Sequence, residues 1–556
     1  MRRSGSEILL EALADEGVRH VFGNPGTTEL PLVDALVGRD APQYVLALQE
    51  ATAVGMADAY GRLTRRPSFV NLHTVAGLAN GLGNLTNAVA AGTPMVVTAG
   101  QQDRRHLISE PLLSGDLVRL AGSLVKWSHE VRTLGELGIT IRRAFRLAAA
   151  PPTGPVFVGI PMDVLEEAGE ALLSPRSQVD DAPMGGSLAE VADLLARAER
   201  PGLVVGNELA WSDGLGAAVE LAQALGAPVH GQPLSSLLVF PSSHPLWRGP
   251  LPIDATGINA TLGAYDRVLV LGADAFLVYP YTAAQPVPEG VELLQIHPDP
   301  AQLGRTLAVR LGVLGDPARC AAELARLLVG RIPAERRQRV LAESEAWRGE
   351  VIARLAEHVI KGRQSKPLGP AAAVQAVVSH LPEDAILVDE AITASPFTRA
   401  FHQGSDSMSY LWSGAGALGW GVPAALGAKL AAPERPVVCI VGDGSFMYSP
   451  QALWTAARYR LNVLTVVLDN REYRILKHGL DLMEGASARS GRYVGMDLAD
   501  PGIDFVALAG SMGIAGRTVE DAEELEQAVD EALGSGEPQL LHVPISGHQT
   551  GGGFGR

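Results

Sequence analysis

The chain has 556 residues and a formal net charge of −16, because 61 Asp and Glu outnumber 45 Lys and Arg, which excludes nucleic-acid binding through bulk charge. Its 47% hydrophobic and 19% charged residues are typical of globular proteins, and its two cysteines exclude a disulfide framework. The polar residues after Met1 and the absence of a long apolar run predict a cytoplasmic protein with no membrane partner.

Helical and strand patterns alternate along the first part of the chain. Helical periodicity covers 7–18, 28–37, 50–63 and 77–91, and short apolar strands are predicted at 20–26, 44–48, 68–74 and 94–100. This alternation predicts a parallel sheet that is covered by helices on both faces.

Two further series of the same kind follow. A loose stretch at 174–187 precedes the second series, which has a helix at 188–200 and strands at 202–207, 267–273 and 293–299. A charged helix at 333–362 leads to the third, with strands at 385–390, 436–444 and 462–470. We therefore predict three doubly wound α/β domains, at 1–175, 185–335 and 365–556. The Gly-rich tail after Gly547 is expected either to be disordered or to order over a ligand.

The sharpest motif follows the apolar run PVVCIV, which leads directly into Gly442-Asp443-Gly444-Ser445. The next apolar strand ends at Asp469-Asn470, so Asp443 and Asn470 are expected at the carboxyl ends of two strands of one βαβ unit, where α/β sheets bind ligands. Carboxylate and amide oxygens suit Mg²⁺ shared with phosphates, and the glycines would let a diphosphate approach the backbone. A plain turn is the alternative.

The segment from GDGS to LDN resembles the cofactor motif of thiamine-diphosphate-dependent enzymes, whose three-domain layout also matches this chain. Within that family the chain is most similar to benzoylformate decarboxylases. That similarity rests on GNPGTTELP, ALQEATAVGMADAYGR, NLHTVAGLANGLGN, VTAGQQDRR, LVKWSHE and ALWTAARY. It covers the first and third domains well and the middle one weakly.

The resemblance implies thiamine diphosphate and Mg²⁺ as cofactors and assigns residues to them. Mg²⁺ is expected on the side chains of Asp443 and Asn470 and on the backbone carbonyl of Glu472. The diphosphate contacts that it implies are Gly444, Ser445, Tyr473 and Thr393, with Gly416 and Leu418 at the aminopyrimidine and Glu50 bonded to the pyrimidine ring. The family often has Asn-Asn-Gly where this chain has Asp469-Asn470-Arg471.

Each assignment has a structural alternative. Glu50 opens a helix, where a carboxylate is favoured by the helix dipole alone, and Leu418 fits an ordinary core position. His73 matches a catalytic histidine and Thr27 a substrate-binding serine of the resembling enzymes. Tyr279 aligns with a second catalytic histidine, and a phenol with a pKa of about 10 would shuttle protons poorly near neutrality.

The segment at 471–497 also departs from the resembling enzymes. Lys477, His478, Arg489 and Arg492 can add positive charge there. A basic lid would favour an anionic substrate, while the alternative is a solvated helix face.

The first hypothesis for function is non-oxidative decarboxylation of a bulky 2-oxo acid to an aldehyde and CO2. A carboligase of the acetolactate-synthase type or an acyl-CoA lyase is the alternative, and a non-catalytic paralogue is a third. The resemblance also implies a homodimer or homotetramer, because Glu50 and the Gly-Asp-Gly motif lie in different domains and come from opposite chains in that family.

Overall fold

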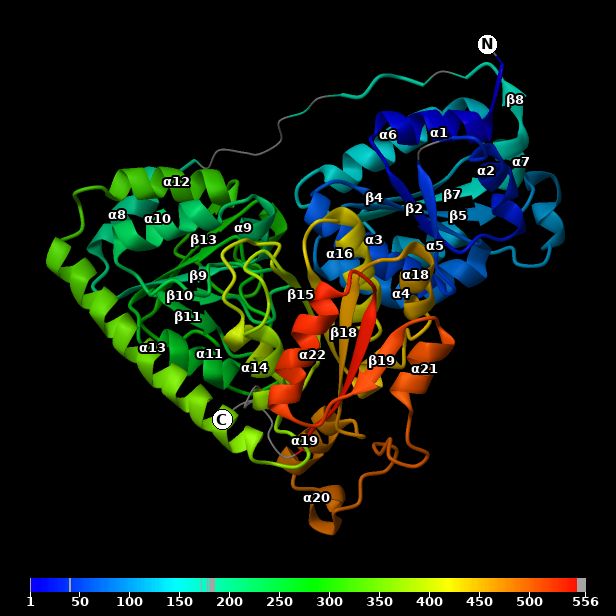
Figure 1. Ribbon diagram of the computed structural model, residues 1–556. Helices are drawn as coiled ribbons and strands as arrows, with labels where there is room; N and C mark the ends of the chain where they lie inside the picture. The colour runs from blue at the N-terminus through cyan, green and yellow to red at the C-terminus, as the bar shows by residue number, and fades with distance from the viewer. Residues whose placement is uncertain (1, 40–41, 172, 178, 180–185, 548–556) are drawn as a thin grey trace.

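The computed structural model describes residues 2–39, 42–171, 173–177, 179 and 186–547. Three six-stranded sheets organise the chain into a first, a central and a third unit (Figure 1). Their strands run parallel, and helices cover both faces. The predicted architecture of three doubly wound α/β units is confirmed, whereas the exact domain limits stay a prediction.

The first unit carries its strands in the order β3-β2-β4-β5-β7-β6. Its elements are β1 (Arg3–Ser4), α1 (Gly5–Asp15), β2 (His20–Gly23), α2 (Leu30–Ala35), β3 (Gln43–Leu46), α3 (Glu50–Thr64), β4 (Ser68–Leu72), α4 (Thr74–Ala90), β5 (Met95–Gln101), α5 (Leu117–Gly122), β6 (Ser128–Glu130), α6 (Leu134–Ala149), β7 (Pro155–Pro161), α7 (Met162–Glu166) and β8 (Ala168–Gly169). The short strands β1 and β8 pair with each other in antiparallel fashion.

The central unit has the strand order β11-β10-β9-β12-β13-β14. Its elements are α8 (Leu188–Arg197), β9 (Pro201–Val205), α9 (Asn207–Trp211), α10 (Leu215–Leu225), β10 (Val229–Gly231), β11 (Trp247–Pro250), α11 (Ala255–Leu262), β12 (Arg267–Leu271), β13 (Glu292–His297), β14 (Leu311–Leu314) and α12 (Pro317–Leu328). The long helix α13 (Ala334–Arg363) then runs along the outside of this unit toward the third (Figure 1).

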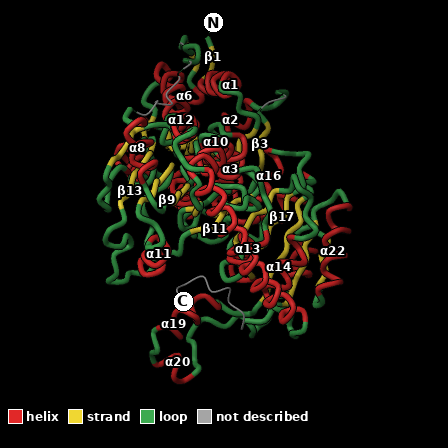
Figure 2. The backbone as a smooth tube through the Cα atoms, turned by 90° about the vertical axis from the view of Figure 1, so that its left-hand side faces the viewer, coloured by secondary structure: helices red, strands yellow, loops and turns green. Residues whose placement is uncertain are grey.

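The third unit has the strand order β16-β15-β17-β18-β20-β19. Its elements are α14 (Pro370–Val378), β15 (Ile386–Glu390), α15 (Ser395–Phe401), β16 (Tyr410–Trp412), α16 (Gly421–Ala431), β17 (Val437–Gly442), α17 (Asp443–Phe446), α18 (Ala452–Tyr459), β18 (Val463–Asp469), α19 (Arg474–Leu482), α20 (Ala486–Ser490), α21 (Phe505–Ser511), β19 (Ala515–Thr518), α22 (Ala522–Gly534) and β20 (Gln539–Pro544). Figure 2 shows α19 and α20 extending away from the sheets.

The predicted strands and helices all have counterparts near the expected positions, because buried parallel strands and amphipathic helices leave clear patterns in the sequence. One local difference is at Gly442-Asp443-Gly444-Ser445, where the predicted turn is instead the helical turn α17. Much of the predicted linker at 174–187, and the glycine-rich tail from residue 548 onward, lie outside the described residues.

The first and third units are packed together through α3 and α16. Small residues allow this close approach, since a Cβ on Gly427 of α16 would lie 2.0 Å from the backbone oxygen of Met56 on α3. This packing holds α16, and the segment with Gly416 and Leu418 that precedes it, against the helix that begins with Glu50.

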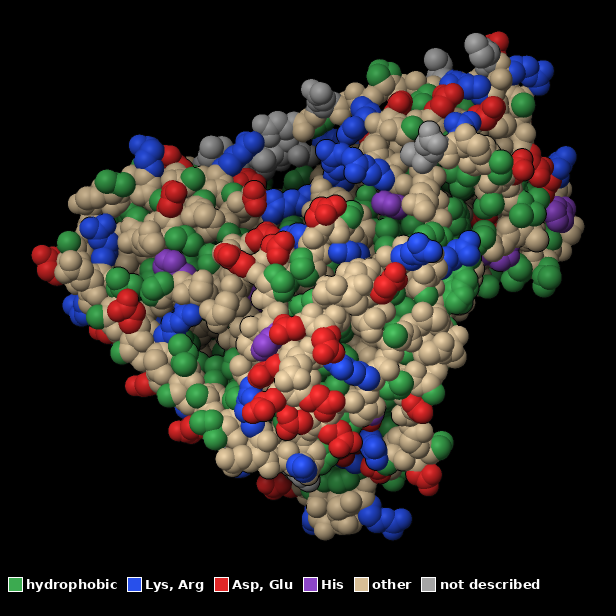
Figure 3. All heavy atoms as spheres, in the orientation of Figure 1, with side chains coloured by type: hydrophobic (Ala, Val, Ile, Leu, Met, Phe, Trp, Pro, Cys, Tyr) green, Lys and Arg blue, Asp and Glu red, His purple; other side chains and the backbone are tan. Residues whose placement is uncertain are grey.

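The surface charge is unevenly distributed. Figure 3 shows acidic side chains gathered over α22, which contributes Glu523, Glu524, Asp530 and Glu531. None of the described helices combines the length and the apolar character that a membrane crossing requires.

Candidate active site

The strands β17 and β18 bring the Asp443 and Asn470 segments to one edge of the third sheet. The two strands pair in parallel with Gly442 opposite Leu468, so Asp443 and Asp469 follow at the same level, and Asn470 comes next. The predicted juxtaposition at the carboxyl ends of these two strands is therefore present.

Asp443 has an incomplete set of hydrogen bonds although its side chain is buried. Its Oδ1 accepts from the backbone N–H of Gly444 at 2.9 Å, whereas Oδ2 is buried without a hydrogen-bond partner. Burial, and after it the neighbouring Asp469 carboxyl, raise the pKa of Asp443 to about 7. A buried carboxylate oxygen that no N–H group reaches, beside the second carboxyl of Asp469, attracts a cation, so this position fits a metal ion.

Asp469 and Asn470, at the end of β18 and just after it, make different hydrogen bonds. The Asp469 carboxylate is bonded within the chain, because it accepts from the N–H of Arg471 at 2.9 Å and lies 2.9 Å from Nε2 of His542. Asn470 Oδ1 accepts from the N–H of Glu472 at 3.0 Å, which turns the loop back toward the sheet. Among the described residues no group of three His, Cys, Asp or Glu forms a metal site, so a cation here would need amide or backbone oxygens beside Asp443.

Arg471 occupies the position where the resembling enzymes often have glycine. Its φ of 59° lies in the left-handed region that favours glycine. The loop thus keeps a glycine-like backbone with an arginine in place, at a cost of roughly 1 kcal/mol.

A buried lysine ties this loop to a later segment. Lys477 of α19 is paired with the carboxylates of Glu472 and Asp497, and the N–H of Tyr473 donates to Met496 O at 2.9 Å. The charge of Lys477 is therefore neutralised within the chain, which corrects its predicted part in a basic lid. A Cβ on Gly444 would lie 2.5 Å from the ring of Tyr473, so a larger residue there would displace that ring.

The other predicted contacts of the third unit lie around the same sheet. Ser445 is buried in α17, and Thr393 is half-buried in the segment between β15 and α15. Gly416 is exposed with a φ of 80°, and Leu418 is half-buried beside it in the segment that precedes α16.

In the first unit, Glu50 is the first residue of α3, as predicted. The residue is 8% exposed, and its carboxylate accepts from Nδ2 of Asn80 at 3.1 Å and from Nδ2 of Asn24 at 3.3 Å. Gly77 packs against it, because a Cβ on Gly77 would lie 3.3 Å from Oε1 of Glu50 and 3.5 Å from Cβ of His73. Glu50 and His73 therefore both lie next to Gly77.

His73 precedes α4 and is held by a carboxylate that the sequence reasoning missed. Its Nδ1 lies 2.9 Å from Oε2 of Glu29, which is 1% exposed and also accepts from the N–H groups of Gly26 and Gly100. The hydroxyl of Thr28 donates to Glu29 Oε1 at 2.6 Å. An ionised Glu29 accepts only, so Nδ1 of His73 carries the hydrogen and Nε2 is left to act on another group.

Two predicted residues lie apart from these networks. The side chain of Thr27 is exposed, whereas the neighbouring Thr28 faces His73 at 3.2 Å from Nδ1. Tyr279 is 64% exposed on the loop after β12, close in sequence to Tyr281, which is 89% exposed. Within the described part of the chain, no hydrogen bond or ion pair joins Glu50 or His73 to Asp443 or Asn470.

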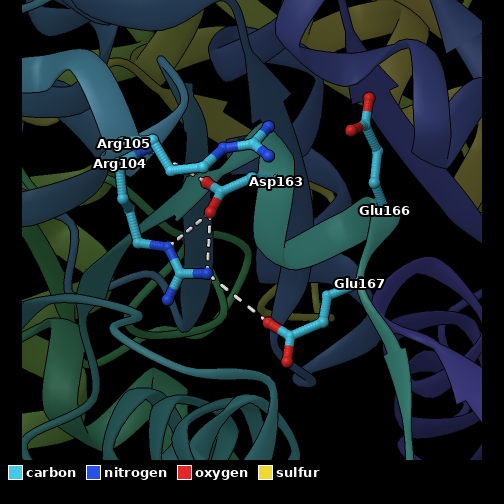
Figure 4. A pocket seen from close by; sticks show the side chains of 5 residues that line it. All are labelled: Arg104, Arg105, Asp163, Glu166 and Glu167. Atoms are coloured by element: carbon cyan, nitrogen blue, oxygen red, sulfur yellow. Dashed lines mark hydrogen bonds and ion pairs between the residues drawn. The ribbon is translucent and has the colours of Figure 1, made fainter.

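A pocket of about 570 Å³ lies elsewhere, beside α7 of the first unit, and contains none of the predicted site residues. Figure 4 shows Arg104 between Asp163 and Glu167, with a 2.7 Å ion pair to Asp163. Arg104 pairs with Asp163 and Glu167, and Arg105 pairs with Asp103, whereas Glu166 is exposed to solvent. The pocket therefore holds no buried charged group comparable to Asp443.

Comparisons with known proteins agree with this geometry. Models of the thiamine pyrophosphate enzymes match in three parts: the N-terminal TPP binding domain at 3–113, the central domain at 188–324 and the C-terminal TPP binding domain at 393–543. These matches cover both the Glu50 and His73 segment and the Asp443 and Asn470 segment.

Individual relatives are similar over nearly their whole length. The chain is 36% identical to benzoylformate decarboxylase of Pseudomonas aeruginosa, covering 96% of this chain and 97% of that protein. It is 29% identical to an acetolactate synthase isozyme 3 large subunit of Escherichia coli, covering 95% and 92%. The solved 4-hydroxybenzoylformate decarboxylase of Rhodococcus jostii superposes with a TM-score of 0.86 at 32% identity, covering 98% and 99%. The chain belongs to the thiamine-diphosphate-dependent enzymes.

Proposed function

We propose that this enzyme decarboxylates an aryl or similarly bulky 2-oxo acid to the corresponding aldehyde and CO2, with thiamine diphosphate and Mg²⁺. The observation that carries the proposal is the pair of His73 and Glu29 beside Glu50, at the carboxyl edge of the first sheet. The 36% identity to a benzoylformate decarboxylase over 96% of the chain supports the same reaction class.

The third unit would hold the charged end of the cofactor. Asp443, Asn470 and the carbonyl of Glu472 would bind Mg²⁺, and the unpaired Oδ2 of Asp443 fits that role. Gly444, Ser445, Tyr473 and Thr393 would contact the diphosphate. Gly416 and Leu418 would hold the aminopyrimidine, with Glu50 bonded to its ring. When bound, thiamine diphosphate supplies a carbon nucleophile and a sink for the electrons that CO2 leaves behind.

Side chains of the first unit would transfer the proton that the reaction requires. The overall reaction converts a 2-oxo carboxylate and one proton into an aldehyde and CO2, and the proton ends on the former ketone carbon. Nε2 of His73 is the atom that we assign to this transfer, because Glu29 holds Nδ1 and thereby orients the ring. Thr27, exposed at the same end of the sheet, would contact the substrate carboxylate.

A complete site would need two chains. The first unit of the same chain contacts the third through α18, where the hydroxyl of Tyr459 donates to Tyr44 O and that of Thr455 to Leu46 O. In Figure 1, α19, which follows the Asn470 loop, lies far from α3, which begins with Glu50. We therefore propose a homodimer or homotetramer in which Glu50 of one chain completes the Asp443 site of another.

A carboligase of the acetolactate-synthase type or an acyl-CoA lyase is the second candidate. Tyr279 in place of a second catalytic histidine favours it, as does the 29% identity to an acetolactate synthase. An exposed phenol is a poor proton shuttle near neutrality, so the last protonation could be slow enough for a second carbonyl compound to compete.

The test is CO2 release and product identification with purified protein, Mg²⁺ and thiamine diphosphate across a panel of aryl and alkyl 2-oxo acids. Benzaldehyde from benzoylformate, absent in Glu50→Gln, would support the decarboxylase. CO2 release that occurs only together with a ketol product would favour the carboligase. Cofactor binding without CO2 release from any 2-oxo acid would overturn the proposal.

A further inference from the structure

The segment Trp412–Trp420, from the last residue of β16 to the start of α16, is here called the cofactor loop because it carries Gly416 and Leu418. Most of it lacks regular secondary structure, so its backbone N–H and C=O groups need partners from elsewhere. Trp412 N donates to Ser236 O and Trp420 N to Glu390, whereas the backbone between them is bonded by side chains of the first unit of the same chain.

Asn87 on α4 supplies the central contacts. Its side chain is completely buried, and its amide binds both polar groups of one backbone residue: Nδ2 donates to Ala417 O at 2.8 Å, and Oδ1 accepts from Ala417 N at 3.1 Å. Oδ1 also accepts from Ala415 N at 3.3 Å, and Nδ2 donates to Asn84 at 3.1 Å. Every hydrogen-bonding position of this amide is used.

A buried ion pair on α3 holds the two ends of the same loop. Arg62 and Asp58 are both 0% exposed and 2.5 Å apart. Arg62 donates to Trp412 O at 2.5 Å, and its guanidinium lies 4.7 Å from the ring centre of Trp420. The indole N–H of Trp420 donates to Asp58 at 2.7 Å. The ends of the loop are thus fixed independently of Asn87.

We propose that Asn87 is a positioning residue for cofactor binding. By holding Ala417, it sets the backbone of Gly416 and the side chain of Leu418, which flank Ala417 and are expected to hold the aminopyrimidine. This inference rests on the proposed role of Gly416 and Leu418. It adds that the first unit of a chain shapes the cofactor site of its own third unit through α4.

Asn87→Leu tests the proposal, because leucine has a similar volume but no polar atoms. Ala417 N–H and C=O would lose their partners, and the loop could relax away from its binding conformation. We expect the Kd for thiamine diphosphate, measured calorimetrically with Mg²⁺, to rise at least about tenfold. Hydrogen exchange of the peptide 413–420 should also become faster in the cofactor-free protein, which reports on the loop without turnover.

Gln295→Met is the matched control. Gln295 is 1% exposed in β13 of the central unit, donates to Ala273 O at 3.5 Å and accepts from Gly304 N at 3.0 Å. Its loss removes the same kind of buried amide far from the cofactor loop. We expect a lowered unfolding midpoint with an unchanged Kd.

Asn87→Asp separates positioning from general destabilisation. A buried Asp that is ionised would place an oxygen against Ala417 O, whereas a protonated one could donate to it as asparagine does. The ratio of variant to wild-type Kd should therefore shrink as the pH is lowered from 8 to 6. Wild-type Kd in both variants, or equal weakening in Gln295→Met, would overturn the proposal. Failure of the wild type to bind thiamine diphosphate would instead contradict the proposed function.

Discussion

The carboxyl edges of the first and third sheets hold their polar groups in opposite ways. At the first, Glu29 accepts from two backbone N–H groups, from Thr28 and from His73, so its network is closed by the chain itself. At the third, Oδ2 of Asp443 is buried and unpaired. The closed network fixes the orientation of His73, to which we assign the proton transfer, whereas the open one leaves a buried oxygen that a cation could pair with.

The largest effect should come from Asp443→Asn, which removes the open carboxylate. We expect affinity for Mg²⁺ in the presence of thiamine diphosphate to fall at least about 100-fold, because an amide is a weaker ligand than a carboxylate. The unfolding midpoint of the cofactor-free protein should stay the same or rise, since the repulsion between the neighbouring carboxyl groups of Asp443 and Asp469 is lost. Calorimetric titration and thermal unfolding measure both. A marked drop in the cofactor-free midpoint would show that Asp443 is structural.

Disrupting the hydrogen bonds of Glu29 should have a smaller effect, which should appear in kcat and not in cofactor binding. Glu29→Gln leaves one acceptor oxygen for four donors, so His73 loses its fixed orientation or changes tautomer. We expect kcat on the preferred 2-oxo acid to fall about 100-fold with little change in the Kd for thiamine diphosphate. Glu130→Gln, a half-buried carboxylate of β6, is the control. Full turnover in Glu29→Gln would remove the basis for assigning proton transfer to His73.

Glu390 is a second buried acid of the third unit, and its ionisation should make the stability of the protein depend on pH. Burial raises the pKa of Glu390 to about 7, although hydrogen bonds from the N–H groups of Gly421 and Trp420 oppose that shift. The Asp389 carboxylate and the Cys439 thiol are the other titratable groups near the Glu390 carboxyl. A raised folded-state pKa means that the folded protein binds the extra proton. Stability therefore falls as the pH rises from about 4.5 to 7, by at most about 1.4 kcal/mol per pH unit for one group.

Urea unfolding of the cofactor-free protein between pH 5 and 8 measures this slope. Glu390→Gln should flatten it, and Glu208, whose burial raises its pKa to about 7 in the central unit, should account for part of the slope that remains. An identical slope in wild type and Glu390→Gln would contradict the assignment.

The smallest effect is expected at Arg471. Glycine would relieve the positive φ of 59° but would add freedom to the unfolded chain, so Arg471→Gly should change the free energy of unfolding by less than about 1 kcal/mol. Arg471→Val, with a branched Cβ at the same φ, should destabilise by about 1–2 kcal/mol. Equilibrium urea unfolding distinguishes them. Equal stability of all three proteins would show that the loop relaxes freely.

Much of this arrangement was predictable because its signals are local. The apolar strands before Gly442-Asp443-Gly444 and before Asp469-Asn470 predicted one shared sheet edge, and the helix that opens at Glu50 was expected at its observed position. The short helix α17 was not, since a Gly-Asp-Gly segment is compatible with several kinds of turn.

The sequence by itself determined the three parallel sheets and the sheet edge that carries Asp443 and Asn470, because hydrophobic periodicity and the Gly-Asp-Gly motif are patterns within a few residues. Only the tertiary structure decided which polar groups act together. Glu29 meets His73 across 44 positions, Asn87 meets Ala417 across 330, and Lys477 is neutralised by Glu472 and Asp497 rather than left free. Such partners are selected by burial, which forces polar groups far apart in sequence to satisfy one another and leaves no pattern along the chain.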